Sequence, residues 1–373
     1  GGRGRRVHTL IWVPTIASAE KINKEMTTRG CNLLSDGRPI IGLTSIQVAE
    51  LVLTIEPQAL IIPAHAWTPW FSVYGKMGGF DSIEEAFGPF AKHIYAVETG
   101  LSSDPAMNWR IAELDHRAIL SFSDAHSGPK LGREATVFEI PDGELSYDAI
   151  YQAVRGSGSY RFTRSSLEAR IPNLDARIAY TIEFHPEEGK YHYTGHRACK
   201  IRWAPEEVQH KGTTCPTCGK PLTQGVMQRV EQLASRSEAS LQLTTHNVQL
   251  TTSGAPITVT SSAAFPNRPP YVMTVPLQEI ISEAIGSPVA SPKVALQYDR
   301  LVSEFNNEFS ILLQSSIASI SKIAGERVAE GVDKVRRGDI VIDPGYDGVF
   351  GVVKIWGEGE TKDTSKEQLS MFS

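Results

Sequence analysis

A carboxylate and an imidazole lie two residues apart at Asp124 and His126, directly after an apolar run. Two other apolar runs end in residues with similar chemistry, the first in His65 and the second in Glu98. Nitrogen and oxygen donors that converge from the ends of strands can bind a divalent cation. A polar turn after a strand accounts for any one of these residues alone. Three such runs in succession predict a metal site formed by His65, Glu98, Asp124 and His126.

A second group of residues has the spacing of a zinc site. His196-x-x-Cys199 is followed by Cys215-x-x-Cys218-Gly, and the glycine permits the tight turn that brings both sulfurs to one ion. A redox pair would not need the second pair of ligands, so the spacing favours structural zinc. His192 is the alternative to His196 as the fourth ligand.

The elements that must position the first group alternate between strand and helix. Alternation of this kind is typical of a parallel α/β sheet or barrel, in which catalytic residues lie at the carboxyl ends of the strands. Strands are predicted at residues 7–13, 59–65, 93–98, 119–124 and 133–140, and helices at 17–29, 44–53, 107–115 and 147–155. A further helix is predicted to start within residues 81–85 with Asp81 or Ser82 as its cap, and Thr44 is a candidate N-cap.

The composition beyond residue 155 divides the rest of the chain. Helices are predicted at 276–285, 293–313 and 317–337, followed by a β-hairpin at 340–356 around a Pro-Gly turn. The Ser/Thr-rich segment is either an exposed hairpin or a disordered insertion. We predict a domain at 1–155, a linker at 156–176, a zinc module at 177–235, a Ser/Thr-rich insertion at 236–268, a helical domain at 269–357 and a charged tail at 358–373.

The overall composition limits the classes of partner. The 373 residues are 41% hydrophobic and carry a net charge of −5, so nucleic-acid binding has to come from local Lys and Arg clusters. No apolar run approaches the length of a membrane span, and the expected location is cytoplasmic. No P-loop motif is present, which disfavours a helicase. Because the chain starts with a strand pattern and without Met, we expect an N-terminal portion to precede Gly1.

Seven short segments carry a resemblance to a known family: PAHAWTPWF (63–71), ETGLSSDP (98–105), SFSDAHS (121–127), GREAT (132–136), YTIEF (180–184), GKYHY (189–193) and PGYDG (344–348). Together they resemble the endonuclease Q family, whose members carry a PHP (polymerase and histidinol phosphatase) domain. The similarity also includes the cysteine segment and covers nearly all of the chain except the insertions near 157–176 and 237–266.

The resemblance implies a partial PHP-type (β/α) barrel and a nuclease that nicks DNA on the 5′ side of uracil, hypoxanthine or xanthine. On the PHP pattern, His65, Glu98, Asp124 and His126 match positions that bind the catalytic metals, which would be Zn²⁺, Mn²⁺ or Mg²⁺. The family's opening His-x-His motif matches nothing in this sequence. The zinc module and the helical region would hold the DNA duplex.

Three further features bear on DNA recognition. A damaged base has to leave the stack to be inspected, and Trp67, Trp70 and Phe71 either wedge into DNA or pack in the core. Arg336 and Arg337 either bind a phosphate or end a solvated helix. The tail resembles the pentapeptide that binds bacterial sliding clamps, through Gln368, Leu369, Met371 and Phe372, with Met371 where Leu is usual.

Two other functions remain open on the sequence. The same ligands would serve a PHP phosphoesterase that acts on a small phosphorylated metabolite, although the zinc module and the tail would then have no role. A non-catalytic DNA-binding or clamp-associated protein is the third reading, since the His-x-His ligands are missing from this chain.

Overall fold

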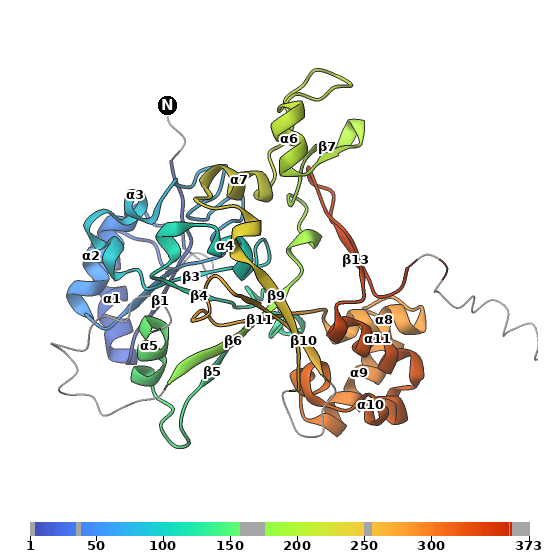
Figure 1. Ribbon diagram of the computed structural model, residues 1–373. Helices are drawn as coiled ribbons and strands as arrows, with labels where there is room; N and C mark the ends of the chain where they lie inside the picture. The colour runs from blue at the N-terminus through green and yellow to red at the C-terminus, as the bar shows by residue number, and fades with distance from the viewer. Residues whose placement is uncertain (1–3, 35–38, 157–175, 250–255, 358, 360–373) are drawn as a thin grey trace, which may run out of the picture.

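A computed structural model describes residues 4–34, 39–156, 176–249, 256–357 and 359. An α/β body, a small projecting module around β7 and α6, and a helical lobe made of α8 to α11 are distinct in Figure 1. Most of the predicted linker, residues 250–255 of the Ser/Thr-rich segment and the predicted clamp-binding residues lie outside the described residues.

The helices and strands have the following bounds. The helices are α1 (Ile16–Thr28), α2 (Ser45–Ile55), α3 (Ile83–Phe87), α4 (Pro105–Trp109), α5 (Tyr147–Gly156), α6 (Pro205–Lys211), α7 (Val226–Leu233), α8 (Leu277–Ile285), α9 (Pro292–Phe305), α10 (Ile317–Ala324) and α11 (Glu326–Arg337). The strands are β1 (Thr9–Trp12), β2 (Leu60–Pro63), β3 (Ala96–Glu98), β4 (Ala118–Leu120), β5 (Ala135–Glu139), β6 (Arg177–Phe184), β7 (Thr194–His196), β8 (Ile201–Trp203), β9 (Leu243–Val248), β10 (Ile257–Ser262), β11 (Tyr271–Thr274), β12 (Val341–Asp343) and β13 (Val352–Lys354).

Side-chain caps explain where several helices begin. Thr44 caps α2 in a capping box, in which its Oγ1 accepts from the Gln47 amide and Gln47 Oε1 accepts from the Thr44 amide. Ser82 caps α3 in the same position relative to the helix. Both predicted caps are therefore confirmed. The helix predicted at 107–115 is instead two short pieces, because Asp104 caps α4 and the helix ends at Trp109.

The first four strands do not follow the predicted all-parallel order. β1 pairs antiparallel with β2, whereas β3 and β4 are parallel, with Glu98 opposite Leu120. Two helices, α1 and α2, separate β1 from β2, so the chain returns to the sheet from the opposite end. Among the described residues the hydrogen-bonded pairings do not close into a ring. The chain is a mixed α/β protein, and the predicted barrel is not confirmed.

A mixed sheet joins segments that are far apart in the sequence. Its strand order is β5-β6-β11-β10-β9, with β6 and β11 parallel and the other neighbours antiparallel. β9 and β10 form a hairpin from the Ser/Thr-rich segment, which resolves the alternatives there in favour of a hairpin. Ile257 and Val259 of β10 are buried, which explains the alternating apolar positions.

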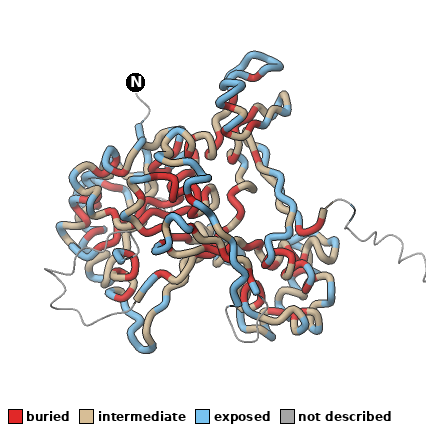
Figure 2. The backbone as a smooth tube through the Cα atoms, viewed as in Figure 1, coloured by how far each residue is buried: buried red, intermediate tan, exposed pale blue. Residues whose placement is uncertain are grey.

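The helical lobe has its own core. Helices α8 to α11 surround buried aliphatic residues and Trp356, and Figure 2 shows buried segments both here and in the α/β body. The predicted helix at 317–337 is broken at Gly325, whose φ of 88° favours glycine. The predicted hairpin is confirmed as the β12–β13 pair. None of the described helices combines the length and apolar character that crossing a bilayer requires.

Candidate functional site

The ends of β2 and β3 bring His65 and Glu98 together. The backbone amide of His65 donates to Glu98 Oε2 at 2.7 Å, and the next amide, of Ala66, donates to the Glu98 carbonyl at 2.9 Å. Both side chains are buried, at 8% and 3% exposure. Two residues that are 33 positions apart are therefore fixed side by side at one edge of the strands.

The backbone at this edge is in an unusual conformation. His65 has a φ of 33° and Asp124 a φ of 42°, which are uncommon for residues with a side chain. Gly100, with a φ of 60°, lies against His65, because a Cβ on Gly100 would be 2.4 Å from His65 Cβ. Strain of this kind is often found at functional sites.

The surroundings of the Glu98 carboxyl change its pKa. Burial raises its pKa to about 7, the amide of His65 opposes that rise, and the negative charge of Asp124 adds to it. A divalent cation beside Glu98 would favour its ionised form, so a buried carboxylate with imidazoles nearby is a donor set that fits a metal ion.

His126 is the outermost of the four predicted ligands. Its Nδ1 lies 2.8 Å from the carbonyl oxygen of Asp124 and 4.0 Å from Asp124 Oδ1, and its side chain is 55% exposed. Within the described residues, only one group of three or more His, Cys, Asp and Glu ligands lies within 4.8 Å of one another, and it is the cysteine group. The ligand roles of His65, Glu98, Asp124 and His126 thus stay predictions.

His8, which was not among the predicted ligands, also lies at this site. Its Nδ1 is 2.9 Å from His65 Nε2, and its carbonyl accepts from the amide of Ala64 at 3.0 Å. The antiparallel pairing of β1 with β2 creates this contact. Little in the sequence indicates this role. His8 lies at the start of a predicted strand, whereas the predicted ligands lie at the ends of strands.

Behind Glu98 lies a buried pair of acids that the sequence reasoning missed. Glu183 accepts hydrogen bonds from Thr99 Oγ1 at 3.0 Å and Ser121 Oγ at 3.1 Å, and Glu134 accepts from the amide of Phe184. Burial raises the pKa of Glu183 to about 8, and burial together with the nearby Glu183 raises that of Glu134. The pair ties β3, β4 and β6 together beneath the metal-ligand candidates.

The four predicted zinc ligands form a compact group. His196, Cys199, Cys215 and Cys218 have ligand atoms within 4.8 Å of one another, and Cys218 Sγ is 3.4 Å from His196 Nδ1. His192 lies outside this group and is buried, which lowers its pKa to about 4. The geometry therefore supports His196 rather than His192 as the fourth ligand.

The local fold explains how these four residues meet. His196 ends β7, Cys199 follows in a short turn, and Cys215 and Cys218 lie on a knuckle closed by Gly219, whose φ is 70°. The core of the module is small and includes Trp203, Val208 and Leu222. Three thiols and one imidazole are a donor set typical of structural zinc.

Two of the four predicted DNA-contact residues are buried. Trp67 is 1% exposed, stacks on Tyr74 with ring centroids 4.7 Å apart and donates from its indole to Asn108. Arg336 is also 1% exposed. Both belong to cores, which corrects the prediction that they contact DNA.

The other two are exposed. Trp70 is 40% exposed. The Arg337 side chain is 49% exposed and pairs with Asp333 at 3.0 Å.

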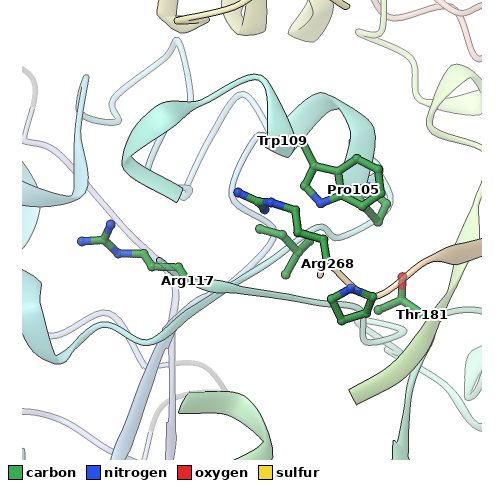
Figure 3. A pocket seen from close by; sticks show the side chains of 7 residues that line it. Pro105, Trp109, Arg117, Thr181 and Arg268 are labelled. Carbon is green, nitrogen blue, oxygen red and sulfur yellow. The ribbon is translucent and has the colours of Figure 1, made fainter. Parts of the chain in front are cut away.

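Two hollows differ in size and position. The one in Figure 3, lined by Trp109, Arg117, Thr181 and Arg268 among others, has a volume of about 10 Å³ and has room for about one water molecule. A larger hollow of about 350 Å³ is lined by Gly4, Arg6, Trp70, Phe71, Met77 and Gly78. It lies beside His8, because the Phe71 carbonyl accepts from the amide of His8 at 2.7 Å, and His8 in turn contacts His65.

Comparison with known proteins finds similar sequences as well as similar solved structures. A family model described as the MJ0043 C-terminal domain matches residues 276–339. The uncharacterized protein MJ0043 of Methanocaldococcus jannaschii is 29% identical over 294 residues, which are 78% of this chain and 31% of that protein. The uncharacterized protein YqxK of Bacillus subtilis is 28% identical over 354 residues, which are 93% of this chain and 74% of that protein. The chain thus spans about a third of the length of MJ0043.

Two crystal structures are similar over almost the whole chain. The lesion-specific endonuclease PfuEndoQ from Pyrococcus furiosus has a TM-score of 0.74 at 29% identity, with 99% of this chain and 79% of that chain covered. A complex of endonuclease Q with a 27-mer duplex that carries an abasic lesion at the active site has a TM-score of 0.72 at 29% identity, with 96% and 79% covered.

Proposed function

We propose that this chain is a member of the endonuclease Q family and forms part of a metal-dependent DNA-repair endonuclease that nicks the strand on the 5′ side of deaminated bases. The observation that carries the proposal is the match to a lesion-specific endonuclease over 99% of the chain at 29% identity. The substrates proposed are duplexes containing uracil, hypoxanthine or xanthine.

In this proposal His65, Glu98, Asp124 and His126 hold the catalytic cation. A bound Zn²⁺, Mn²⁺ or Mg²⁺ supplies charge neutralisation at the scissile phosphate and acidifies water. Glu98 contributes only when ionised, so its pKa of about 7 makes cation binding weaker below neutral pH. His8 supports the site by holding the His65 ring from the side of β1.

The surroundings of the ligands fix their geometry. Gly100 leaves space for His65, and the Glu98 carboxylate is oriented by the His65 amide. Thr99 and Ser121, which donate to Glu183, anchor the ends of β3 and β4 to β6. A site on rigid strand ends keeps its ligands in place before the substrate arrives.

The remaining parts of the chain would hold the DNA. Structural zinc bound by His196, Cys199, Cys215 and Cys218 stabilises the module. Trp70 stacks on the substrate, and the hollow beside it has room for a base that has left the stack. Arg337 contacts phosphate from the helical lobe, and the tail residues 368–372 bind a sliding clamp.

Nicking of lesion-containing duplexes by the full-length protein tests the function. We expect a 5′ nick at uracil or hypoxanthine in the presence of Mg²⁺, Mn²⁺ or Zn²⁺, and its loss in Asp124→Ala. Asp142→Ala is the matched control, because Asp142 is exposed in a loop outside the site. An Asp124→Ala variant that nicks at the wild-type rate would remove the metal-site assignment.

Two other results would select a different function. Release of phosphate from small phosphomonoesters without DNA cleavage would identify a phosphoesterase that uses the same ligands. Tight DNA binding by a metal-loaded, full-length protein that cleaves nothing would identify a non-catalytic DNA-binding or clamp-associated protein.

A further inference from the structure

The loop of the β12–β13 hairpin carries two exposed apolar side chains. Val349 is 41% exposed and Phe350 is 68% exposed, next to each other at positions 349 and 350. Adjacent exposed apolar side chains form a patch, and patches with a polar rim mark binding sites more often than single exposed residues do. In Figure 1 the hairpin runs from the helical lobe toward the module that contains β7.

The backbone on either side of these residues is held in place. The amides of Gly345 and Gly351 donate to the carbonyls of Glu187 and Glu188 at 2.8 and 3.0 Å. A Cβ on Gly351 would lie 2.0 Å from the Glu187 carbonyl oxygen, so the two segments are in close backbone contact. Phe350 therefore extends from a rigid loop and loses little freedom when it binds.

A lysine and two aromatic rings connect this loop to the candidate active site. Lys190 Nζ lies 5.5 Å from the ring centroid of Phe350 and 5.7 Å from that of Tyr191. Tyr191 in turn meets Trp70 edge to face, with ring centroids 5.1 Å apart. Trp70 follows His65 by five residues, so the series leads from the hairpin to the metal-ligand candidates.

Basic side chains lie beside the two aspartates of the hairpin. Arg202 pairs with Asp343 and also donates to the carbonyl of Pro344 at 2.9 Å, while Asp347 accepts from the amide of Arg197 at 2.7 Å. Both nearby aspartates are thereby partnered, whereas the ammonium of Lys190 faces aromatic rings. Such a surface pairs stacking with phosphate attraction, as in proteins that bind unpaired nucleic acid.

We propose that Phe350 is a wedge that enters the base stack of substrate DNA beside the nucleotide that leaves it, with Lys190 at the neighbouring phosphate. Nucleic-acid-binding proteins insert apolar side chains between base steps in this way, and the inserted ring replaces lost stacking. The inference rests on the proposed function, because it assigns a contact to the same DNA substrate. The occupant of this surface is a duplex opened at the lesion.

The test compares a fully paired lesion duplex with a bubble in which the lesion is already unpaired. For the full-length protein, Phe350→Ala should lower kcat/KM on the duplex roughly tenfold or more and leave the bubble nearly unchanged, because the bubble needs no wedge. Phe350→Trp should retain activity on both. Leu296→Ala is the matched control, since Leu296 is an exposed apolar residue, 62% accessible, on α9.

A second readout separates failure of the wedge from failure of the nuclease assignment. With 2-aminopurine next to the lesion, wild-type protein should raise the fluorescence on binding, and Phe350→Ala should not, whether or not the strand is cut. An equal loss on duplex and bubble, an unchanged duplex rate, or the same fluorescence rise in Phe350→Ala would overturn the wedge. Dimerisation that Phe350→Ala abolishes would instead identify a second copy as the occupant. Absence of nicking by wild type together with the expected fluorescence difference would refute only the proposed nuclease function.

Discussion

Replacement of Arg336 by alanine should destabilise the helical lobe without removing a DNA contact. The guanidinium donates to three carbonyl oxygens, those of Ile311, Leu312 and Ser315, at 2.7, 2.8 and 2.8 Å. These carbonyls belong to, or directly follow, the π-helical turn Ser310–Gln314. Burial lowers the pKa of Arg336 to about 10, so the group stays charged at neutral pH.

The size of the effect follows from these bonds. A hydrogen bond to a charged group contributes about 1.5–3 kcal/mol, and a carbonyl left buried without a donor loses a similar amount. Three bonds at the lower value give about 4.5 kcal/mol, so we expect Arg336→Ala to lower the free energy of unfolding by about 3–5 kcal/mol. That loss is large relative to the whole free energy of unfolding of a typical protein, about 5–15 kcal/mol.

Urea unfolding together with hydrogen exchange resolved to residues 310–337 would measure the loss. Arg337→Ala is the matched control, because its side chain is exposed and should change stability by less than about 0.5 kcal/mol. Arg337→Ala should also reduce the slope of log K against log salt concentration for DNA binding by about 1, the value for one lost phosphate contact. The reasoning is refuted if Arg336→Ala keeps wild-type stability and instead weakens DNA binding.

Three further predictions concern the cysteine group, the predicted metal ligand His65 and the buried acid Glu183. Chelation of zinc, or Cys218→Ser, should release one equivalent of metal and remove hydrogen-exchange protection from residues 194–223, because the module has only a small core. Helices α8 to α11 should stay protected. Protection of residues 194–223 that persists without metal would contradict this prediction. Gly100→Ala should lower the melting temperature and weaken metal binding, because the added Cβ displaces His65. Gly143→Ala is the control: Gly143 also has a positive φ, but no atom lies within 4 Å of the added Cβ. The control should cost only the backbone strain of about 1 kcal/mol. The raised pKa of Glu183 means that its contribution to stability is complete below its unfolded pKa of about 4.5 and is lost as the pH rises through about 8. Melting temperatures of metal-free protein should therefore fall from pH 5 to pH 8, and the fall should be smaller in Glu183→Gln; parallel pH profiles would show that Glu183 does not titrate in this range.

Short-range features were accessible from the sequence because their geometry is set by neighbouring residues. The cysteine knuckle needs only the spacing of Cys215 and Cys218 and the glycine after them, and the group of four ligands is found together. The cap of α2 likewise depends on Thr44 and Gln47, three residues apart.

Features that depend on packing between distant segments were decided only by the tertiary structure. Trp67 and Arg336 have the residue types of DNA contacts, but both are buried. Trp67 packs on Tyr74 and α4, and Arg336 donates to the carbonyls of the Ser310–Gln314 turn. His8 reaches His65 only because two helices reverse the direction of β1 relative to β2. Glu134 and Glu183, 49 residues apart in the sequence, become neighbours through the pairing of β5 with β6. A sequence pattern reports the local periodicity of an element, whereas burial and the pKa of an acid depend on what covers it, which is set by contacts across the whole chain.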